Sequence, residues 1–352
     1  MICRFSYDIN PGRILFGAGT LDAVAAEMER LGAKRALILS TAFQRADATR
    51  LAERLGSLAA GVFSEAAMHT PVAVTLKALE AFEAVQADCV VSFGGGSTIG
   101  LGKAIAWRND TPQIVIATTY AGSEVTPILG QTENGIKTTV RDAKILPEVV
   151  IYDPTLTTGL PVPMSVTSGL NAMAHAVEGV YARDRNPVSS IMAVEGVRAL
   201  RDALRVIVAQ PDDLPARSNA LYGSWLCGSV LGTVGMALHH KLCHTLGGSF
   251  DLPHAETHAI VLPHSAAYNA EAAAAELQPL ADLFGGSIGG GLYDFAKSLG
   301  APLALKDLGL KESQLDEAAD LAVKNPYWNP RPIERDGVRA LLQRAWAGTR
   351  PE

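Results

Sequence analysis

The sequence is poor in the features that mark secreted or nucleic-acid-binding proteins. It has only 4 cysteines in 352 residues, and none form a CxxC pair. We therefore expect reduced thiols rather than a disulfide framework or a zinc site. There is no run of Lys or Arg, and the formal net charge is −6, which argues against nucleic acid or an anionic membrane as a partner. The cysteines are Cys3, Cys89, Cys227 and Cys243.

Long apolar segments are also scarce. The first residues, Met1 to Asp8, lack the apolar core of a signal peptide, which predicts a cytoplasmic protein. The stretch Ala220–Leu238 is uncharged over 19 positions, close to the length of a membrane span. Four glycines interrupt it and His239-His240-Lys241 follows it, so we expect a buried helix and no membrane partner.

Charged residues make up only 19% of the chain and hydrophobic residues 48%, which is typical of a large core, and the length corresponds to about two domains. Helical patterns at 21–31, 46–55 and 72–85 alternate with apolar runs at 35–40, 88–93 and 113–117. This alternation predicts a parallel sheet covered on both faces. After the proline-rich segment 146–163 only helical patterns remain. We expect a Rossmann-like α/β nucleotide-binding domain over 1–160 and an all-α domain over 161–352.

A glycine cluster, Gly94-Gly95-Gly96-Ser97, follows the apolar run 88–93 and leads into a helical pattern. Backbone N–H groups converge at a helix N-terminus and glycine lets a phosphate approach them, so the cluster predicts a phosphate site. The spacing matches neither the Walker A nor the Rossmann fingerprint, and a tight turn without ligand remains the alternative. A similar cluster at 285–291 has no strand before it, and we expect an inter-helix loop there.

Two threonines, Thr118 and Thr119, follow the apolar run 113–117. The carboxyl ends of parallel strands face the ligand crevice, so these hydroxyls are expected to meet the nucleotide, with simple capping of the chain end as the alternative. Ser40 and Thr41 end the first apolar run without an acidic residue that would disfavour a 2′-phosphate.

Six of the 8 histidines lie between His239 and His264. Helical i,i+4 spacing joins Asn171 to His175 and His240 to His244, and His254 follows. Such a cluster beside apolar helix predicts a ligand or proton-transfer site. Three imidazoles resemble a metal set, but Asn171 offers a neutral amide where a carboxylate is expected, and the residues alone leave the metal undecided.

Several motifs together resemble the iron-containing alcohol dehydrogenase family over essentially the whole chain. They are GGGS at 94–97, TTYAGSE at 118–124, the Asn171/His175 helix, the His240/His244 pair and LPHAETHAIVLPH at 252–264. The resemblance implies an N-terminal nucleotide-binding α/β domain and a C-terminal helical domain.

Three departures from the family pattern are similar to its maleylacetate reductase branch. The threonine loop is one residue shorter, the aspartate common after GGGS falls on Gly100, and the aspartate metal ligand falls on Asn171. The branch implies reduction of maleylacetate, a small dicarboxylate, to 3-oxoadipate in the catabolism of aromatic compounds. It further implies NADH or NADPH as cofactor, no metal, and a homodimer.

The resemblance also implies roles for individual residues. Gly94, Gly95, Gly96 and Ser97 would bind the pyrophosphate, and Thr118, Thr119 and Lys137 would line the rest of the cofactor site. Asn171, His175, His240 and His254 occupy the family's metal positions, and His244 that of its active-site histidine. We expect His244 to donate a proton to carbon and the other three histidines to bind substrate oxygens. Tyr120 is a candidate substrate contact that alternatively only packs.

Other functions remain open at this point. The nearest is a metal-dependent alcohol or polyol dehydrogenase, which Asn171 and Gly100 disfavour. A non-catalytic nucleotide-binding protein on the same fold is a second. A sugar-phosphate cyclising enzyme is a third, although it would need a complete metal site. Arg331 and Lys241 are possible carboxylate partners but equally ordinary surface charges.

Overall fold

The computed structural model describes residues 5–7, 10, 12–324 and 327–352, and the chain forms two compact units. The first lies within Ile9–Leu160, and the second is Pro161–Glu352 together with residues 5–7. The division after Leu160 falls where the change of sequence pattern places it. Residues 5–7 differ from the expectation, because they group with the helical unit.

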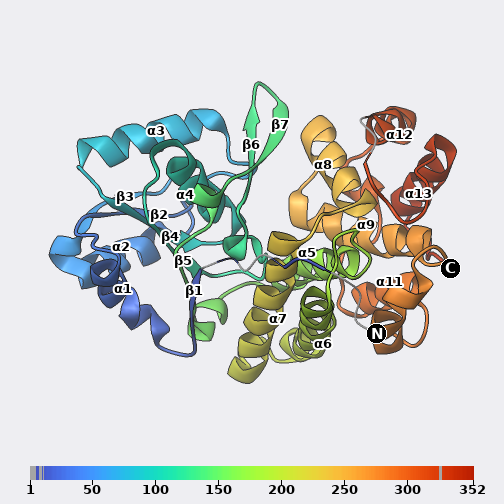
Figure 1. The fold of residues 1–352 in the computed structure, drawn as a ribbon, viewed down its shortest axis with the longest axis horizontal. Helices are drawn as coiled ribbons and strands as arrows, with labels where there is room; N and C mark the ends of the chain where they lie inside the picture. The colour runs from blue at the N-terminus through green and yellow to red at the C-terminus, as the bar shows by residue number, and fades with distance from the viewer. Residues whose placement is uncertain (1–4, 8–9, 11, 325–326) are drawn as a thin grey trace. The chain divides into compact units, whose positions relative to one another are not determined.

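The first unit contains a six-stranded parallel sheet in the order β1-β8-β5-β4-β2-β3 (Figure 1). Its strands are β1 (Arg13–Phe16), β2 (Ala36–Leu39), β3 (Ala59–Phe63), β4 (Cys89–Gly94), β5 (Gln113–Ala117) and β8 (Val149–Tyr152). The three expected strands are β2, β4 and β5. β8, a central strand between β1 and β5, was not predicted, because it lies within the proline-rich segment.

Helices cover both faces of this sheet, as expected. Alternate side chains of β2 point to opposite faces, since Ala36 and Ile38 pack with one cluster and Leu37 and Leu39 with another. The first cluster includes residues of α1 (Val24–Arg30) and α2 (Arg45–Leu55), and the second includes residues of α3 (Val72–Ala84) and α4 (Gly96–Asn109). The sheet is therefore the core of this unit, and its carboxyl edge carries the loops described below.

An antiparallel hairpin, β6 (Ile128–Glu133) and β7 (Ile136–Arg141), lies outside the sheet and was not predicted. Its turn is Asn134-Gly135, with φ values of 50° and 76°. Positive φ at both turn residues is the geometry that favours Asn-Gly in two-residue hairpins, so the signal was present in the sequence.

The described residues of the second unit form helices and their connections, without a strand. Its helices are α5 (Val162–Val180), α6 (Pro187–Ala209), α7 (Leu214–Thr233), α8 (Leu238–Phe250), α9 (His254–Asn269), α10 (Ala274–Leu283), α11 (Ile288–Ser298), α12 (Leu315–Val323) and α13 (Arg335–Ala347). Side chains cap several N-termini, since Asn186 accepts hydrogen bonds at the start of α6 and Asp213 at the start of α7. The all-α expectation for this part of the chain is confirmed.

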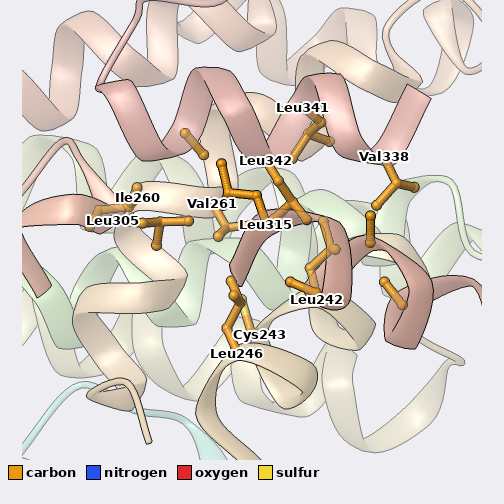
Figure 2. Packing of buried hydrophobic residues seen from close by; sticks show 14 of the residues in the cluster. Leu242, Cys243, Leu246, Ile260, Val261, Leu305, Leu315, Val338, Leu341 and Leu342 are labelled. Atoms are coloured by element: carbon orange, nitrogen blue, oxygen red, sulfur yellow. The ribbon is translucent and has the colours of Figure 1, made fainter. Parts of the chain in front are cut away.

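One apolar cluster joins α8 and α9 to the last two helices (Figure 2). Leu242, Cys243 and Leu246 of α8 meet Leu315 of α12 and Leu341 of α13. This face of α8 is thereby fixed in the core, which orients its histidines on the remaining face.

Two expectations about this unit need correction. The uncharged stretch Ala220–Leu238 is not one helix, because α7 ends at Thr233 and α8 begins at Leu238. Among the described helices none alone has the length and apolarity of a membrane span, although α7 and α8 together do, with a bend of 96° between them. Glycines 289–291 are not a loop but the first turn of α11, where a Cβ on Gly289 would lie 2.6 Å from that of Ala267 on α9.

Candidate active site

The glycine turn between β4 and α4 leaves room for an anion. A Cβ on Gly94, which has φ of +154°, would lie 2.5 Å from Thr98 Oγ1, and one on Gly95 would lie 2.6 Å from the Thr119 side chain. Gly96 begins α4 and faces open space, with no heavy atom within 4 Å of a Cβ placed there. The first N–H groups of α4, at Gly96 and Ser97, lack helical acceptors and can therefore bind a phosphate.

The ends of three neighbouring strands are tied together at this turn. Thr118, after β5, donates its backbone N–H to Gly94 O at 3.1 Å. Its Oγ1 accepts a hydrogen bond of 3.0 Å from Nε2 of Gln44, which lies in the loop after β2. Thr118 and Thr119 thus lie directly against the glycine turn, where the sequence predicts them.

A buried lysine that the sequence analysis did not single out holds the threonine loop. Lys103 Nζ, on α4, donates to Thr126 O at 2.8 Å, Thr126 Oγ1 at 2.9 Å and Ile128 O at 3.0 Å, and also to Ser123 O. Burial lowers the pKa of Lys103 to about 7, although Glu124 acts in the opposite direction. Four acceptor oxygens surround Nζ. An ammonium group offers three N–H donors to them, whereas a neutral amine offers only two, so we take Lys103 to be protonated.

Two further residues of this unit were expected at the cofactor or substrate site, Lys137 and Tyr120. Lys137 is on β7, with its Cε 3.4 Å from where a Cβ on Gly130 would be. Tyr120 is fully buried, at 0% exposure, as a packing residue would be. Their roles toward cofactor and substrate stay predictions.

The absence of the family's aspartate at Gly100 has a steric reason. A Cβ at this position would lie 2.3 Å from Oγ1 of Thr70. Thr70 has φ of +47°, which is rare for a β-branched residue and is held by the hydrogen bond from Thr132 N to its carbonyl. An aspartate would need the Thr70 side chain to move.

In the helical unit, a hydrogen-bonded chain runs from a buried carboxylate through two imidazoles. Asn171, His175 and Glu178 lie on α5 at i, i+4 and i+7. His240 of α8 shares one hydrogen bond of 2.6 Å between Nδ1 and Glu178 Oε2, and another of 2.8 Å between Nε2 and His175 Nδ1. We call this set the Glu178 chain.

Glu178 also binds the N-terminus of α8. Its carboxylate accepts backbone N–H groups from His239 at 2.7 Å, Ala237 at 3.0 Å and His240 at 3.3 Å. Burial raises the pKa of this carboxyl group, but the hydrogen bond and charge of His240 outweigh it, and the pKa falls to about 2. Glu178 is therefore an anion in the core, and it fixes Nδ1 of His240 as a donor.

A second chain has no ionised member. Ser265 Oγ donates to Leu262 O at 3.1 Å, so it accepts from Nδ1 of His239 at 3.0 Å. Nε2 of His239 then accepts from Nδ1 of His258 at 2.9 Å. Burial lowers the pKa of His239 to about 3 and that of His258 well below its ordinary value, so both rings are neutral. The remaining nitrogen, His258 Nε2, has no hydrogen-bond partner in the described part of the chain.

The two expected histidines outside these chains are partly exposed. The ring of His244 lies 6.3 Å from that of His240, and the ring of His254 lies 4.4 Å from that of His258. Asn171, His175 and His240 are buried, at 4%, 4% and 7% exposure. His244 and His254 are thus the members through which protons can exchange with solvent. His264, the last of the sequence cluster, is buried and packs near Tyr293 instead.

The family implies an iron ion, but the donors at the family's metal positions do not fit one. They comprise three imidazoles and an amide, and Asn171 Oδ1 is buried without a hydrogen-bond partner among the residues that the structure describes. Glu178 does not supply the missing carboxylate ligand, because it is committed to His240 and to the N–H groups of α8. His240 Nε2 is already engaged by His175. A separate trio, His239, Cys243 and His258, has ligand atoms within 4.8 Å of one another, but its two histidines are hydrogen-bonded together.

The sequence pattern singles out most of these histidines but not Glu178, His239 and His258, which the structure places in the same hydrogen-bonded chains. For Glu178 a signal existed, because it continues the Asn171/His175 stripe at the next helical turn.

Comparison with known proteins gives matches over nearly the whole chain. Two family models match: "Iron-containing alcohol dehydrogenase" over residues 11–154, and "Fe-containing alcohol dehydrogenase family, C-terminal" over residues 165–346. The maleylacetate reductase of Rhizobium sp. strain MTP-10005 is 66% identical, and that of Burkholderia cepacia 54%, each over 99% of both chains. The crystal structure of the maleylacetate reductase from Agrobacterium tumefaciens superimposes with a TM-score of 0.96 at 66% identity, covering 99% of this chain and 100% of that one.

Proposed function

Because the chain belongs to the iron-containing alcohol dehydrogenase family, we propose that it reduces maleylacetate to 3-oxoadipate with NADH or NADPH as hydride donor. The full-length similarity to maleylacetate reductases supports this oxidoreductase activity on a carbon–carbon double bond. The product is an intermediate expected late in the catabolism of aromatic compounds.

The observation that carries the proposal is the Glu178 chain beside Asn171. Where the family has a carboxylate ligand, this chain has an amide, and the site's carboxylate instead orients two imidazoles. Such an arrangement supplies hydrogen-bond donors and protons to an enolate. A metal-dependent alcohol or polyol dehydrogenase would instead require a Lewis acid to polarise a carbonyl.

The reaction follows from the electronics of the substrate. Maleylacetate has a ketone conjugated to its double bond, so a bound NADH or NADPH would supply hydride to the alkene carbon β to the ketone. The electron pair of the double bond moves onto the ketone oxygen and gives an enolate. A proton delivered to the α carbon then restores the ketone, leaving oxidised cofactor and 3-oxoadipate. The protein has to orient the reacting carbon, stabilise the oxyanion and deliver the proton.

We assign these tasks to the histidines. His244, partly exposed on α8, donates the proton to carbon. His175 and His254 contact the enolate oxygen and the substrate carboxylates, with Asn171 beside them. His240, whose two ring nitrogens are bonded to Glu178 and His175, holds the His175 ring in place. A positioned acid of this kind typically contributes about 10²–10⁴-fold in rate.

The cofactor assignments rest on the glycine turn. Gly94, Gly95, Gly96 and Ser97 bind the pyrophosphate, Thr118, Thr119 and Lys137 line the remaining cofactor site, and Tyr120 adjoins the substrate. No metal takes part. We also propose a cytoplasmic homodimer, in line with the family resemblance.

The deciding experiment is a spectrophotometric assay with maleylacetate and with a simple aldehyde, each with NADH and NADPH. We expect oxidation of the reduced cofactor with maleylacetate and little with the aldehyde. The opposite preference would favour the alcohol dehydrogenase alternative, and no oxidation with any enone or carbonyl would favour a non-catalytic nucleotide-binding protein.

A further inference from the structure

We propose that Phe43 is the stacking platform for the adenine base of the dinucleotide cofactor, an inference that rests on the proposed NAD(P)H-dependent function. Phe43 lies in the loop between β2 and α2 and is 91% exposed, the highest value among the large hydrophobic side chains of the described residues. Because isolated exposed apolar residues are common, its location has to carry the argument.

The loop that carries Phe43 is fastened to the phosphate turn. β2 pairs directly with β4, so the loop emerges beside Gly94. The next residue, Gln44, donates from Nε2 to Thr118 Oγ1 at 3.0 Å. Its Oε1 would lie 2.9 Å from a Cβ on Gly94. Phe43 is therefore one residue away from a side chain that is hydrogen-bonded to Thr118 after β5 and lies close to Gly94 at the end of β4.

The two halves of a dinucleotide extend to either side of its pyrophosphate. We place the pyrophosphate at the N-terminus of α4. On the β5 side of this position lie Thr118 and Thr119, which pack on the glycine turn. In doubly wound folds the adenosine ribose lies over the end of the strand on the other side, here β2 and Thr41. The base attached to that ribose projects past Thr41, and Phe43 is the aromatic ring available there.

The chemistry of the ring suits an adenine. A phenyl face stacks on a purine without needing hydrogen bonds, and removal of such a ring typically weakens binding by about 5- to 100-fold. Since only one face of the base would be covered, we expect the lower part of this range. The phenyl ring carries no charge that would attract or repel a 2′-phosphate, so it would not distinguish NADH from NADPH, in agreement with the proposed use of either cofactor.

The test compares NADH with reduced nicotinamide mononucleotide, which lacks the adenosine half. With maleylacetate as substrate, Phe43→Ala should lower kcat/KM for NADH about fivefold or more. The same variant should leave kcat/KM for the mononucleotide unchanged, and Phe43→Trp should retain NADH activity. Leu76→Ala, which removes a 52% exposed side chain from α3, is the control for loss of surface apolar area.

Three outcomes would overturn the assignment. These are an unchanged kcat/KM for NADH, an equal loss with the mononucleotide, and a change of molecular mass in solution, which would make Phe43 a contact between subunits. Calorimetry with ADP-ribose separates this inference from the proposed function, because it requires no reduction. Weaker ADP-ribose binding by Phe43→Ala would support the adenine site even if maleylacetate were not the substrate, and no binding by the wild-type protein would reject it.

Discussion

Glu178 and His240 share a 2.6 Å hydrogen bond between a fully buried carboxylate and Nδ1 of an imidazole, across two different helices. The same carboxylate accepts the N–H groups at the start of α8. One side chain therefore fixes the orientation of His240 and the position of the helix that carries both His240 and His244.

Replacing Glu178 by Gln should damage the site more than its conservative shape suggests. The amide NH2 of the glutamine would face the backbone N–H groups of α8 and Nδ1–H of His240, which are also donors. The negative charge that orients His240 would be lost as well. We expect kcat to fall at least about tenfold with little change in the KM for NADH, since comparable outer partners of histidines contribute about 10–100-fold. The unfolding free energy should fall by up to about 3–5 kcal/mol, as for a broken buried pair. Glu195→Gln, on the surface of α6, is the matched control. Normal kcat in a folded Glu178→Gln protein would contradict this role.

Replacing His244 by Ala should lower turnover at least about tenfold while NADH binding stays near normal. The reason is that His244 is a partly exposed histidine beside His240 and is assigned the proton transfer to carbon. Steady-state kinetics with maleylacetate and fluorescence titration of NADH measure the two effects separately. An unchanged turnover number would exclude His244 as the proton donor.

Features that lie within one helix or strand could be predicted from the sequence, whereas features formed by contacts between distant segments could not. The pairs Asn171/His175 and His240/His244 lie within single helices, and spacing alone placed each pair on one face. Glu178 was missed because its role arises only when the start of α8, about sixty residues later, packs against α5. β8 was missed because prolines flank it and mask its apolar run, although burial in the middle of the sheet outweighs their local effect.

Stability should decrease as the pH falls below about 6.5. The folded-state pKa values of His239 and His264 are lowered by burial to about 3 and about 4, below their ordinary value of 6.5. The unfolded chain therefore binds more protons between pH 6.5 and 4, and unfolding is favoured as protons are added. Below pH 4.5 the protonation of Glu178, whose folded pKa is about 2, adds to the loss. Urea denaturation from pH 7.5 to 4 measures this dependence.

His264 allows the pH effect to be tested outside the site. Both of its ring nitrogens are buried without a partner among the described residues, so His264→Leu removes two unsatisfied polar atoms. We expect the variant to be at least as stable at pH 7 and less sensitive to acid than the wild type. An unchanged pH dependence would show that His264 is not one of the groups responsible.

Exhaustive chelation should leave the activity with maleylacetate intact, because the four family metal positions offer no carboxylate. The converse variant is Asn171→Asp, which restores the family's ligand type and should increase the Fe²⁺ or Zn²⁺ content measured by elemental analysis. Loss of activity on chelation with rescue by either ion would overturn the metal-free proposal. Unchanged metal content in a folded Asn171→Asp protein would show that the Glu178 chain itself blocks the site.

Arg45 should determine how well the protein uses NADPH relative to NADH. Of the three arginines on α2, Arg50 pairs with Asp47 and Arg54 with Asp22, whereas Arg45 forms no ion pair with any described residue. Arg45 begins α2, two residues after Phe43. The preceding strand, β2, ends without the acidic residue that would disfavour a 2′-phosphate. Arg45→Ala should therefore raise the KM for NADPH about fivefold or more, the loss expected for a charge-assisted contact, and leave that for NADH unchanged. Arg50→Ala should change neither. Equal effects of Arg45→Ala on both cofactors would show that Arg45 supports the loop rather than reading the 2′ position.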